Sequence, residues 1–282
     1  MTLIHLRLGP PTPLDYFATL VASDEQFPLL EAAASLVQDE NPWFDTQEVL
    51  ATLDQMLVRL KRRIPVDASV KVRIGFLNRY FFNELGFAGN LNNFYDAENS
   101  YISTVLRTRL GIPISLAVIW LELAQGLGLK SVGVGFPGHF LVKTACDQAH
   151  IVMDPLSGQS LSREDLAERL THLGLYAEGT QPTERLLAQL LTPCSPRALV
   201  ARMLHNLKEI HAAESDAQRL LAVLDRLIVL LPQAWSEYRD RGLVKVRRGD
   251  TQAAKLDLQT YVDHAPDAQD LAQVSQLIDS LN

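Results

Sequence analysis

The chain has 282 residues, a formal net charge of −7 and 47% hydrophobic residues, enough for one large or two ordinary domains with a buried core. This acidic balance excludes a generic cationic nucleic-acid binder, because phosphate contacts require clustered lysine and arginine. Its two cysteines, Cys146 and Cys194, are too few for a disulfide framework or a zinc site built from cysteines alone.

Neither the first residues nor the longest apolar stretch has the pattern of a targeting or membrane segment. Residues 1–17 lack the unbroken apolar run of a signal peptide. Residues 112–129 are interrupted by proline, serine, glutamate and glutamine, which are too polar for a membrane span. We therefore expect a cytoplasmic protein with reduced thiols and no membrane partner.

The first part of the chain is predicted to be helical. Apolar residues recur at three- and four-residue steps over residues 14–37 and 46–60, and Asn41-Pro42 separates the two segments. A third helical pattern covers residues 70–85 and ends at Gly86.

Residues 86–100 form a segment rich in glycine, asparagine and aspartate, residue types that favour turns. Its aromatic residues predict an ordered loop pinned by Phe87, Phe94, Tyr95 and the following Tyr101. Its polar groups can either bind a ligand or peptide or satisfy the backbone of the loop. The candidate binding residues are Asn90, Asn93, Tyr95, Asp96, Asn99 and Ser100.

A helix that is apolar on most faces is expected to begin near Pro113 and to continue to residue 127, buried at the centre of a domain. Three strand-like runs follow at residues 131–136, 139–144 and 150–154, separated by short turn signals. The pattern predicts an antiparallel sheet packed against the buried helix, which is an α+β fold.

The last part of the chain has a repeating pattern. Asp216 and Asp250 are 34 residues apart, as are Pro232 and Pro266, which predicts tetratricopeptide-type helix-turn-helix repeats with a capping helix over residues 267–281. We therefore expect a domain over residues 1–180, a linker over 181–196 and helical repeats over 197–282.

Three elements of the predicted α+β domain bring together groups that suit nucleophilic chemistry. A nucleophile at a helix start gains from the positive end of the helix dipole. His139 can accept its proton, and Asp154 at the end of the next strand can orient the histidine.

The motifs GIPISL (residues 111–116), FPGHF (136–140) and MDP (153–155) resemble the SirB-type transglutaminase-like domain, whose members carry tetratricopeptide-like repeats after it. The resemblance implies a papain-like core and a Cys-His-Asp triad. His139 and Asp154 match two members of the triad. The cysteine position holds Ser115 or, on another count along the helix, Pro113, so the catalytic cysteine is missing.

Two functions follow from this departure. The first is a protein- or peptide-binding or regulatory module that uses the cleft of the transglutaminase-like domain and the repeats. The second is an acyl-transfer enzyme or amide hydrolase with a Ser115-His139-Asp154 triad. The sequence leaves enzyme activity open, because a serine near a helix start also serves as a helix cap.

The histidines show no spacing typical of zinc ligands, and the chain has no phosphate-binding glycine motif. We therefore expect no metal and no cofactor. The expected partner is a protein or peptide bound through the repeats, and not a nucleic acid.

Overall fold

The computed structural model describes residues 11–147, 149–175 and 182–281. These residues form two compact units. The core unit comprises the described residues of 28–37 and 45–210. The repeat unit comprises those of 11–27, 38–44 and 211–281, so an amino-terminal segment belongs to the same unit as the last helices.

Helix α6 (Pro113–Gly126) is the central helix of the core unit, and most of its residues are buried. Proline at the first helical position has no N–H to leave unsatisfied, and its fixed φ suits a helix. Gly128 follows the helix at φ 73°, a conformation that glycine adopts without steric cost. The prediction of a buried helix that begins at Pro113 is confirmed.

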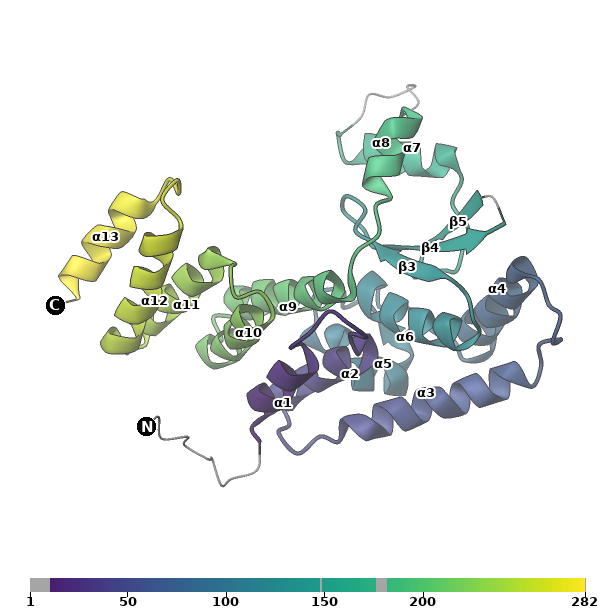
Figure 1. Ribbon diagram of the computed structural model, residues 1–282, viewed down its shortest axis with the longest axis horizontal. Coiled ribbons are helices and arrows are strands. Elements are labelled where there is room, and N and C mark those ends of the chain that lie inside the picture. Colours follow the sequence, from purple (N-terminus) through teal and green to yellow (C-terminus); the bar gives the residue numbers. More distant parts are fainter. Residues whose placement is uncertain (1–10, 148, 176–181, 282) are drawn as a thin grey trace. The chain divides into compact units, whose positions relative to one another are not determined.

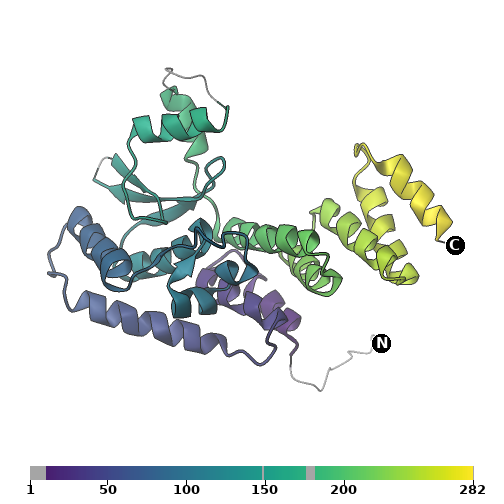
Figure 2. The ribbon, with the colours of Figure 1, turned by 180° about the vertical axis from the view of Figure 1, so that it is seen from behind.

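An antiparallel three-stranded sheet packs on α6. Its strand order is β3 (Ser131–Val134), β4 (Leu141–Cys146), β5 (Ala149–Met153). Helix α6 lies against one face of the sheet, and α7 (Arg163–His172) and α8 (Glu184–Leu190) lie over the other (Figure 1, and from behind in Figure 2). The combination of helices and a small sheet confirms the α+β fold class.

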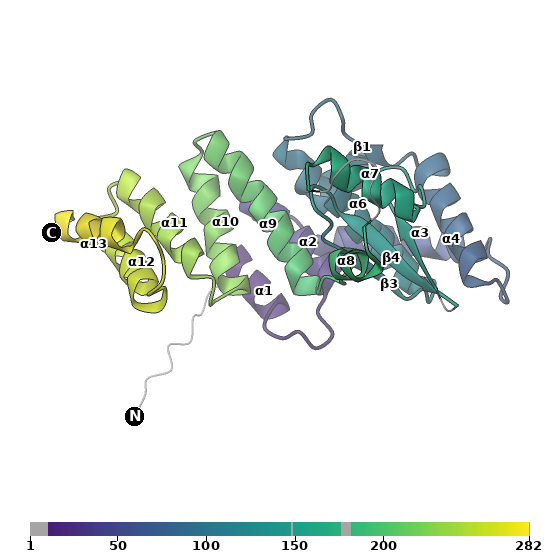
Figure 3. The same ribbon diagram turned by 90° about the horizontal axis from the view of Figure 1, so that it is seen from above.

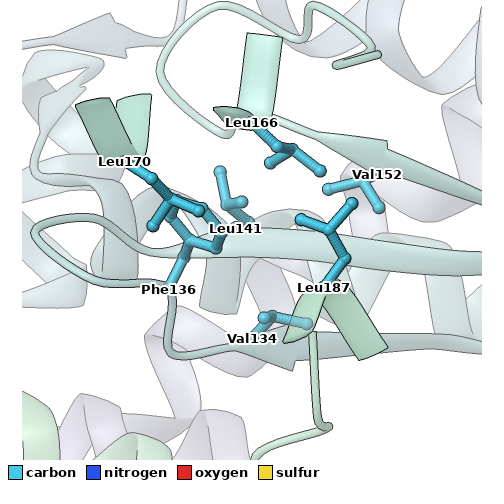
Figure 4. Close-up of a cluster of buried hydrophobic side chains, with 7 residues drawn as sticks. All are labelled: Val134, Phe136, Leu141, Val152, Leu166, Leu170 and Leu187. Carbon is cyan, nitrogen blue, oxygen red and sulfur yellow. The ribbon is translucent and has the colours of Figure 1, made fainter. Parts of the chain in front are cut away.

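A cluster of buried apolar side chains joins the outer face of the sheet to α7 and α8 (Figure 4). It consists of Val134, Phe136, Leu141, Val152, Leu166, Leu170 and Leu187. Burying a side chain of this size contributes about 1.5–3 kcal/mol, so the cluster fixes α7 over one end of the sheet. This contact brings α7 close to the chain segments that follow β3 and β5.

The strands are displaced from the predicted ranges, and the difference concerns a site residue. β3 ends two residues earlier, β4 begins two residues later and β5 begins one residue earlier than predicted. His139 lies in the turn between β3 and β4 and not on a strand, and Asp154 directly follows β5. Gly138 has φ 64°, so the chain turns sharply just before His139. The sequence signalled a turn between these two strands, but the turn extends through residue 140, so the predicted strand began two residues too early.

The predicted helix over residues 14–37 is also wrong in its length. It divides into α1 (Pro13–Leu20) and α2 (Leu29–Ala34), with an irregular segment between them. Pro28 lies directly before α2, and a proline disfavours helical geometry at the preceding residue. Gln26 has φ 54°, which a continuous helix does not allow.

The remaining elements of the core unit are mostly helices. They are α3 (Thr46–Lys61), α4 (Val70–Asn78), a π-helical turn η2 (Arg79–Glu84), a 3₁₀ turn η3 (Ala97–Ser100) and α5 (Ile102–Thr108). A 3₁₀ turn η1 (Ser35–Asp39) follows α2, and the short strands β1 (Ala88–Gly89) and β2 (Leu110–Gly111) pair in parallel. Among the described residues, no helix is both long and apolar enough to cross a membrane.

The last helices follow the predicted repeat spacing. After α9 (Pro196–Ala213) come α10 (Ala217–Leu230), α11 (Trp235–Arg247), α12 (Thr251–His264) and α13 (Leu271–Ser280). Helices α10 to α13 lie side by side in chain order (Figure 3). Gly242 of α11 faces Leu258 of α12 so closely that a β-carbon there would lie 2.7 Å from the leucine Cγ. Glycine at this position therefore allows the two helices to approach.

Helix α1 and residues 38–44 complete the repeat unit by packing on α10. The fully buried guanidinium of Arg226 on α10 binds both carboxylate oxygens of Asp39, at 2.7 and 2.8 Å. The same group lies over the ring of Phe17 of α1, 4.9 Å from its centroid. A buried guanidinium thus links three segments that are distant in sequence.

Candidate functional site

A polar cluster of His139, Asp154 and Arg169 joins the sheet to α7. The imidazole Nε2 of His139 lies 3.0 Å from Asp154 Oδ1, and Arg169 donates a hydrogen bond of 2.6 Å to Asp154 Oδ2. The Asp154 side chain is 8% exposed and that of His139 is 16% exposed. The structure therefore brings together the predicted His139 and Asp154. It also places Arg169 of α7 against Asp154, so that the ion pair joins α7 to the sheet.

The carboxyl group of Asp154 is held in its ionised form. Burial by itself would raise its pKa, but hydrogen bonds from His139, the backbone N–H of Leu156 and Arg169 outweigh it and lower the pKa to about 2. An ionised carboxylate at this position can accept a hydrogen bond from the His139 ring and orient it.

The backbone of His139 is also fixed. Arg202 of α9 donates a hydrogen bond of 3.2 Å to the His139 carbonyl, and its guanidinium lies over the ring of Phe140 at 5.6 Å. Neither Arg169 nor Arg202 was singled out from the sequence. Each lies on an ordinary amphipathic helix, so only the packing of that helix reveals its partner.

Ser115 lies in a fully buried environment and is hydrogen-bonded to backbone groups. Its side chain is fully buried, and its hydroxyl donates to the carbonyl of Asn99 at 2.6 Å while it accepts the N–H of Ile112 at 3.1 Å. Among the described residues, no hydrogen bond joins this hydroxyl to His139. The serine therefore satisfies backbone groups at the start of α6.

Several predicted binding residues of the asparagine-rich loop are buried or hydrogen-bonded within the loop. Asn99 and Ser100 are buried, and Asn99 holds the loop together by accepting from Asn90 and donating to the Asn93 carbonyl. Asp96 accepts the N–H of Glu98 and begins the turn η3. Asn90, Asp96 and Asn99 thus satisfy the loop itself, as one of the two sequence interpretations proposed. The buried hydroxyl of Ser100 has no hydrogen-bond partner among the described residues.

The exposed part of this loop presents apolar side chains to solvent. Leu91 is 78% exposed and Tyr95 82% exposed, and Phe94 packs edge-on against Tyr95. We call these three residues the loop patch. Only Phe87 and Tyr101 are buried, so the prediction that four aromatic residues pin the loop is wrong for Phe94 and Tyr95. Exposed apolar side chains gathered on one loop are typical of interaction surfaces.

The two cysteines lie away from the start of α6. Cys146 is buried at the end of β4, and Cys194 is half-buried in the segment after α8. Within the described ranges, no group of three or more histidine, cysteine, aspartate or glutamate side chains can hold a metal ion.

Comparison with known proteins gives two family matches that divide the chain near residue 206. Residues 47–205 match the transglutaminase-like superfamily, and residues 207–279 match the tetratricopeptide repeat. A UPF0162 protein of Xylella fastidiosa is 38% identical over 92% of this chain and 92% of its own length.

More distant relatives carry the same family name. A UPF0162 protein of Vibrio cholerae is 28% identical and covers 86% of this chain and 89% of its own length. The UPF0162 protein YchA of Escherichia coli is 24% identical over 79% of this chain and 81% of its own length. Among solved structures, a crystal structure of menin covers 90% of this chain and 71% of its own, with 12% identity and a TM-score of 0.37.

Proposed function

We propose a binding function for this chain, which belongs to the UPF0162 family of transglutaminase-like proteins with tetratricopeptide repeats. In this proposal the core unit binds a peptide segment of a partner protein and catalyses no acyl transfer. The segment is recognised by apolar side chains that contact the loop patch of Leu91, Phe94 and Tyr95.

The environment of Ser115 carries the proposal. Acyl transfer needs a nucleophile whose proton passes to a base within hydrogen-bond reach. The Ser115 proton is instead directed to the Asn99 carbonyl, and the side chain has no exposed surface. Turning the Ser115 hydroxyl toward a substrate would break two hydrogen bonds to buried backbone groups. A buried backbone group without a hydrogen-bond partner lowers the stability of the fold.

The loop patch supplies the surface that a binding protein needs. Large apolar side chains that remain exposed lose solvent-accessible area when a partner covers them, and tyrosine in particular is enriched in binding hot spots. The repeats favour the same class of function, since helical repeats stack into extended surfaces that contact partner proteins.

The alternative function is acyl transfer or amide hydrolysis by Ser115 with His139 as the base. The 3.0 Å contact between His139 and Asp154 favours it, because a histidine oriented by a carboxylate is the second half of a triad. A fluorophosphonate probe, which phosphonylates activated serines with loss of fluoride, tests this directly. We expect no labelling of the wild-type protein. Labelling that disappears in both Ser115→Ala and His139→Ala would establish the enzyme instead.

The binding function is tested with phage-displayed random peptides selected on the full chain. Peptides enriched on the wild type are then titrated against a Leu91→Ser/Tyr95→Ser variant by fluorescence anisotropy. We expect binding to weaken about tenfold or more, since each truncated anchor costs about 1–2 kcal/mol. Val66→Ser is the matched control, because Val66 is 97% exposed in the same unit and lies outside the loop patch.

Two outcomes contradict the proposal. If no peptide is enriched over a blank surface, the loop patch does not bind extended segments. If the enriched peptides bind the double variant and Val66→Ser as tightly as the wild type, the loop patch is not the binding surface.

A further inference from the structure

A hollow lies over the part of the sheet that α7 and α8 leave uncovered. Side chains alternate along a strand, so Leu141, Lys143 and Ala145 of β4 share one face of the sheet. At the first end of that face, Leu141 is covered by the leucines of α7 and α8 (Figure 4). Lys143 and Ala145 at the other end line a hollow of about 370 Å³.

The registers of the neighbouring strands place further groups around the hollow. Val132 of β3 is paired with Lys143, and His150 of β5 is paired with Ala145. Cross-strand partners project from the same face, and both residues line the hollow. Lys130, which precedes β3, and Pro193, which forms an isolated β-bridge with Val134, also line the hollow.

The charges around the hollow are all of one sign. Lys130 and Lys143 line it, no acidic side chain among the described residues does, and the chain as a whole carries −7. Lys143 donates one hydrogen bond, of 2.5 Å, to the carbonyl of Leu191, which fixes its ammonium group and leaves two of its protons available. Lys130 is exposed and makes no ion pair with any described residue.

We propose that this hollow binds a small molecule with an anionic headgroup, a carboxylate or a phosphate monoester, attached to an apolar body. Two ammonium groups beside a concave surface concentrate positive potential there and favour an anion over water. Val132, Leu129 and Pro193 provide the apolar contact for the body. The volume lies in the range of about 300–1,000 Å³ that small-ligand sites occupy. This site is separate from the loop patch and from Ser115, and it does not depend on the proposed binding of peptides.

The test is isothermal titration calorimetry of the full chain with three probes: phenyl phosphate, phenylacetate and benzyl alcohol. We expect at least one of the two anions to bind with a millimolar or tighter dissociation constant, and benzyl alcohol to bind more weakly. The tighter anion identifies the headgroup. Its affinity should fall as salt is added, because ions screen partly exposed charges.

Charge reversal at Lys130 locates the site. Lys130→Glu is expected to weaken binding of the tighter anion about tenfold or more. Lys71→Glu is the matched control, because Lys71 is an exposed lysine of the same unit on α4 and changes the net charge equally. A second variant, Lys143→Met, keeps the apolar stem and removes the charge, and its folding is checked by circular dichroism.

Three results would overturn the proposal. The first is that neither anion binds in the millimolar range. The second is that benzyl alcohol binds as tightly as the anions, which would make the hollow merely apolar. The third is that Lys130→Glu and folded Lys143→Met bind the anion as well as Lys71→Glu does, which would place the binding elsewhere.

Discussion

Replacing Asp39 by alanine should destabilise the repeat unit strongly. Arg226 has no exposed side-chain surface, and Asp39 accepts hydrogen bonds from two of its nitrogens, at 2.7 and 2.8 Å. Without this carboxylate, a positive charge stays buried without its bidentate counter-charge. Removing one partner of a buried ion pair costs about 3–5 kcal/mol of stability. Replacing both partners by apolar residues costs much less, because no unpaired charge stays buried.

Urea denaturation at pH 7 measures the effect, with the fluorescence of Trp235 on α11 as a probe within the same unit. With a slope of about 2 kcal/mol per molar urea, a loss of 3–5 kcal/mol lowers the midpoint by about 2 M. The double variant Asp39→Ala/Arg226→Met should recover most of the loss, because it removes the buried charge together with its partner.

Glu40→Ala is the matched control at the adjacent position. Glu40 pairs with Arg219 at 2.8 Å, but the arginine side chain is 48% exposed. A surface pair contributes about 0–1 kcal/mol, so the midpoint should barely change. The reasoning is refuted if Asp39→Ala costs no more than Glu40→Ala, or if adding Arg226→Met lowers the stability further.

Three further predictions test separate parts of the structure. Ser115→Ala should lower the free energy of unfolding by about 1–3 kcal/mol, because two buried backbone groups lose their hydrogen-bond partner. A variant whose urea midpoint equals that of the wild type would contradict this prediction. Asp154 has a pKa lowered to about 2 from 3.8, so its contribution is present above pH 4 and is lost as the pH falls through 2. Stability measured from pH 5 to pH 2 should therefore decline by about 2 kcal/mol more in the wild type than in Asp154→Asn, and parallel curves would disprove the assignment. Gly242→Ala should destabilise the protein by about 1–3 kcal/mol, because the new β-carbon clashes with Leu258. Gly75→Ala is the control: nothing lies within 4 Å of its new β-carbon, so it should stabilise its helix by up to about 1 kcal/mol. Melting temperatures that shift in the same direction for both variants would contradict the packing argument.

Several local signals in the sequence predicted the structure correctly, because the hydrogen bonds that they create lie within a few residues. Pro113 begins α6, where the sequence predicted the start of the buried helix. Asp216 and Asp250, the pair that indicated the repeat spacing, directly precede α10 and α12. Each of these outcomes depends on one residue type and its immediate neighbours.

The candidate site was only partly predictable. His139 and Asp154 were found because they match a family motif, and the structure places them 3.0 Å apart. Arg169 was missed, because its contact with Asp154 depends on where α7 packs on the sheet. The exposure of Phe94 and Tyr95 was missed for a related reason: an aromatic residue in a loop is buried only if another element covers it.

Local periodicity and motifs were sufficient to predict the family, the α+β class, the buried helix and the spacing of the repeats. The role of Ser115, which caps α6 and donates to the Asn99 carbonyl, became visible only in the folded chain. The tertiary structure also decided that Asp39 joins the repeat unit through Arg226, 187 residues away in sequence. The physical reason is that a side chain's partner is fixed by packing between distant segments, and residue type alone does not determine which segments meet.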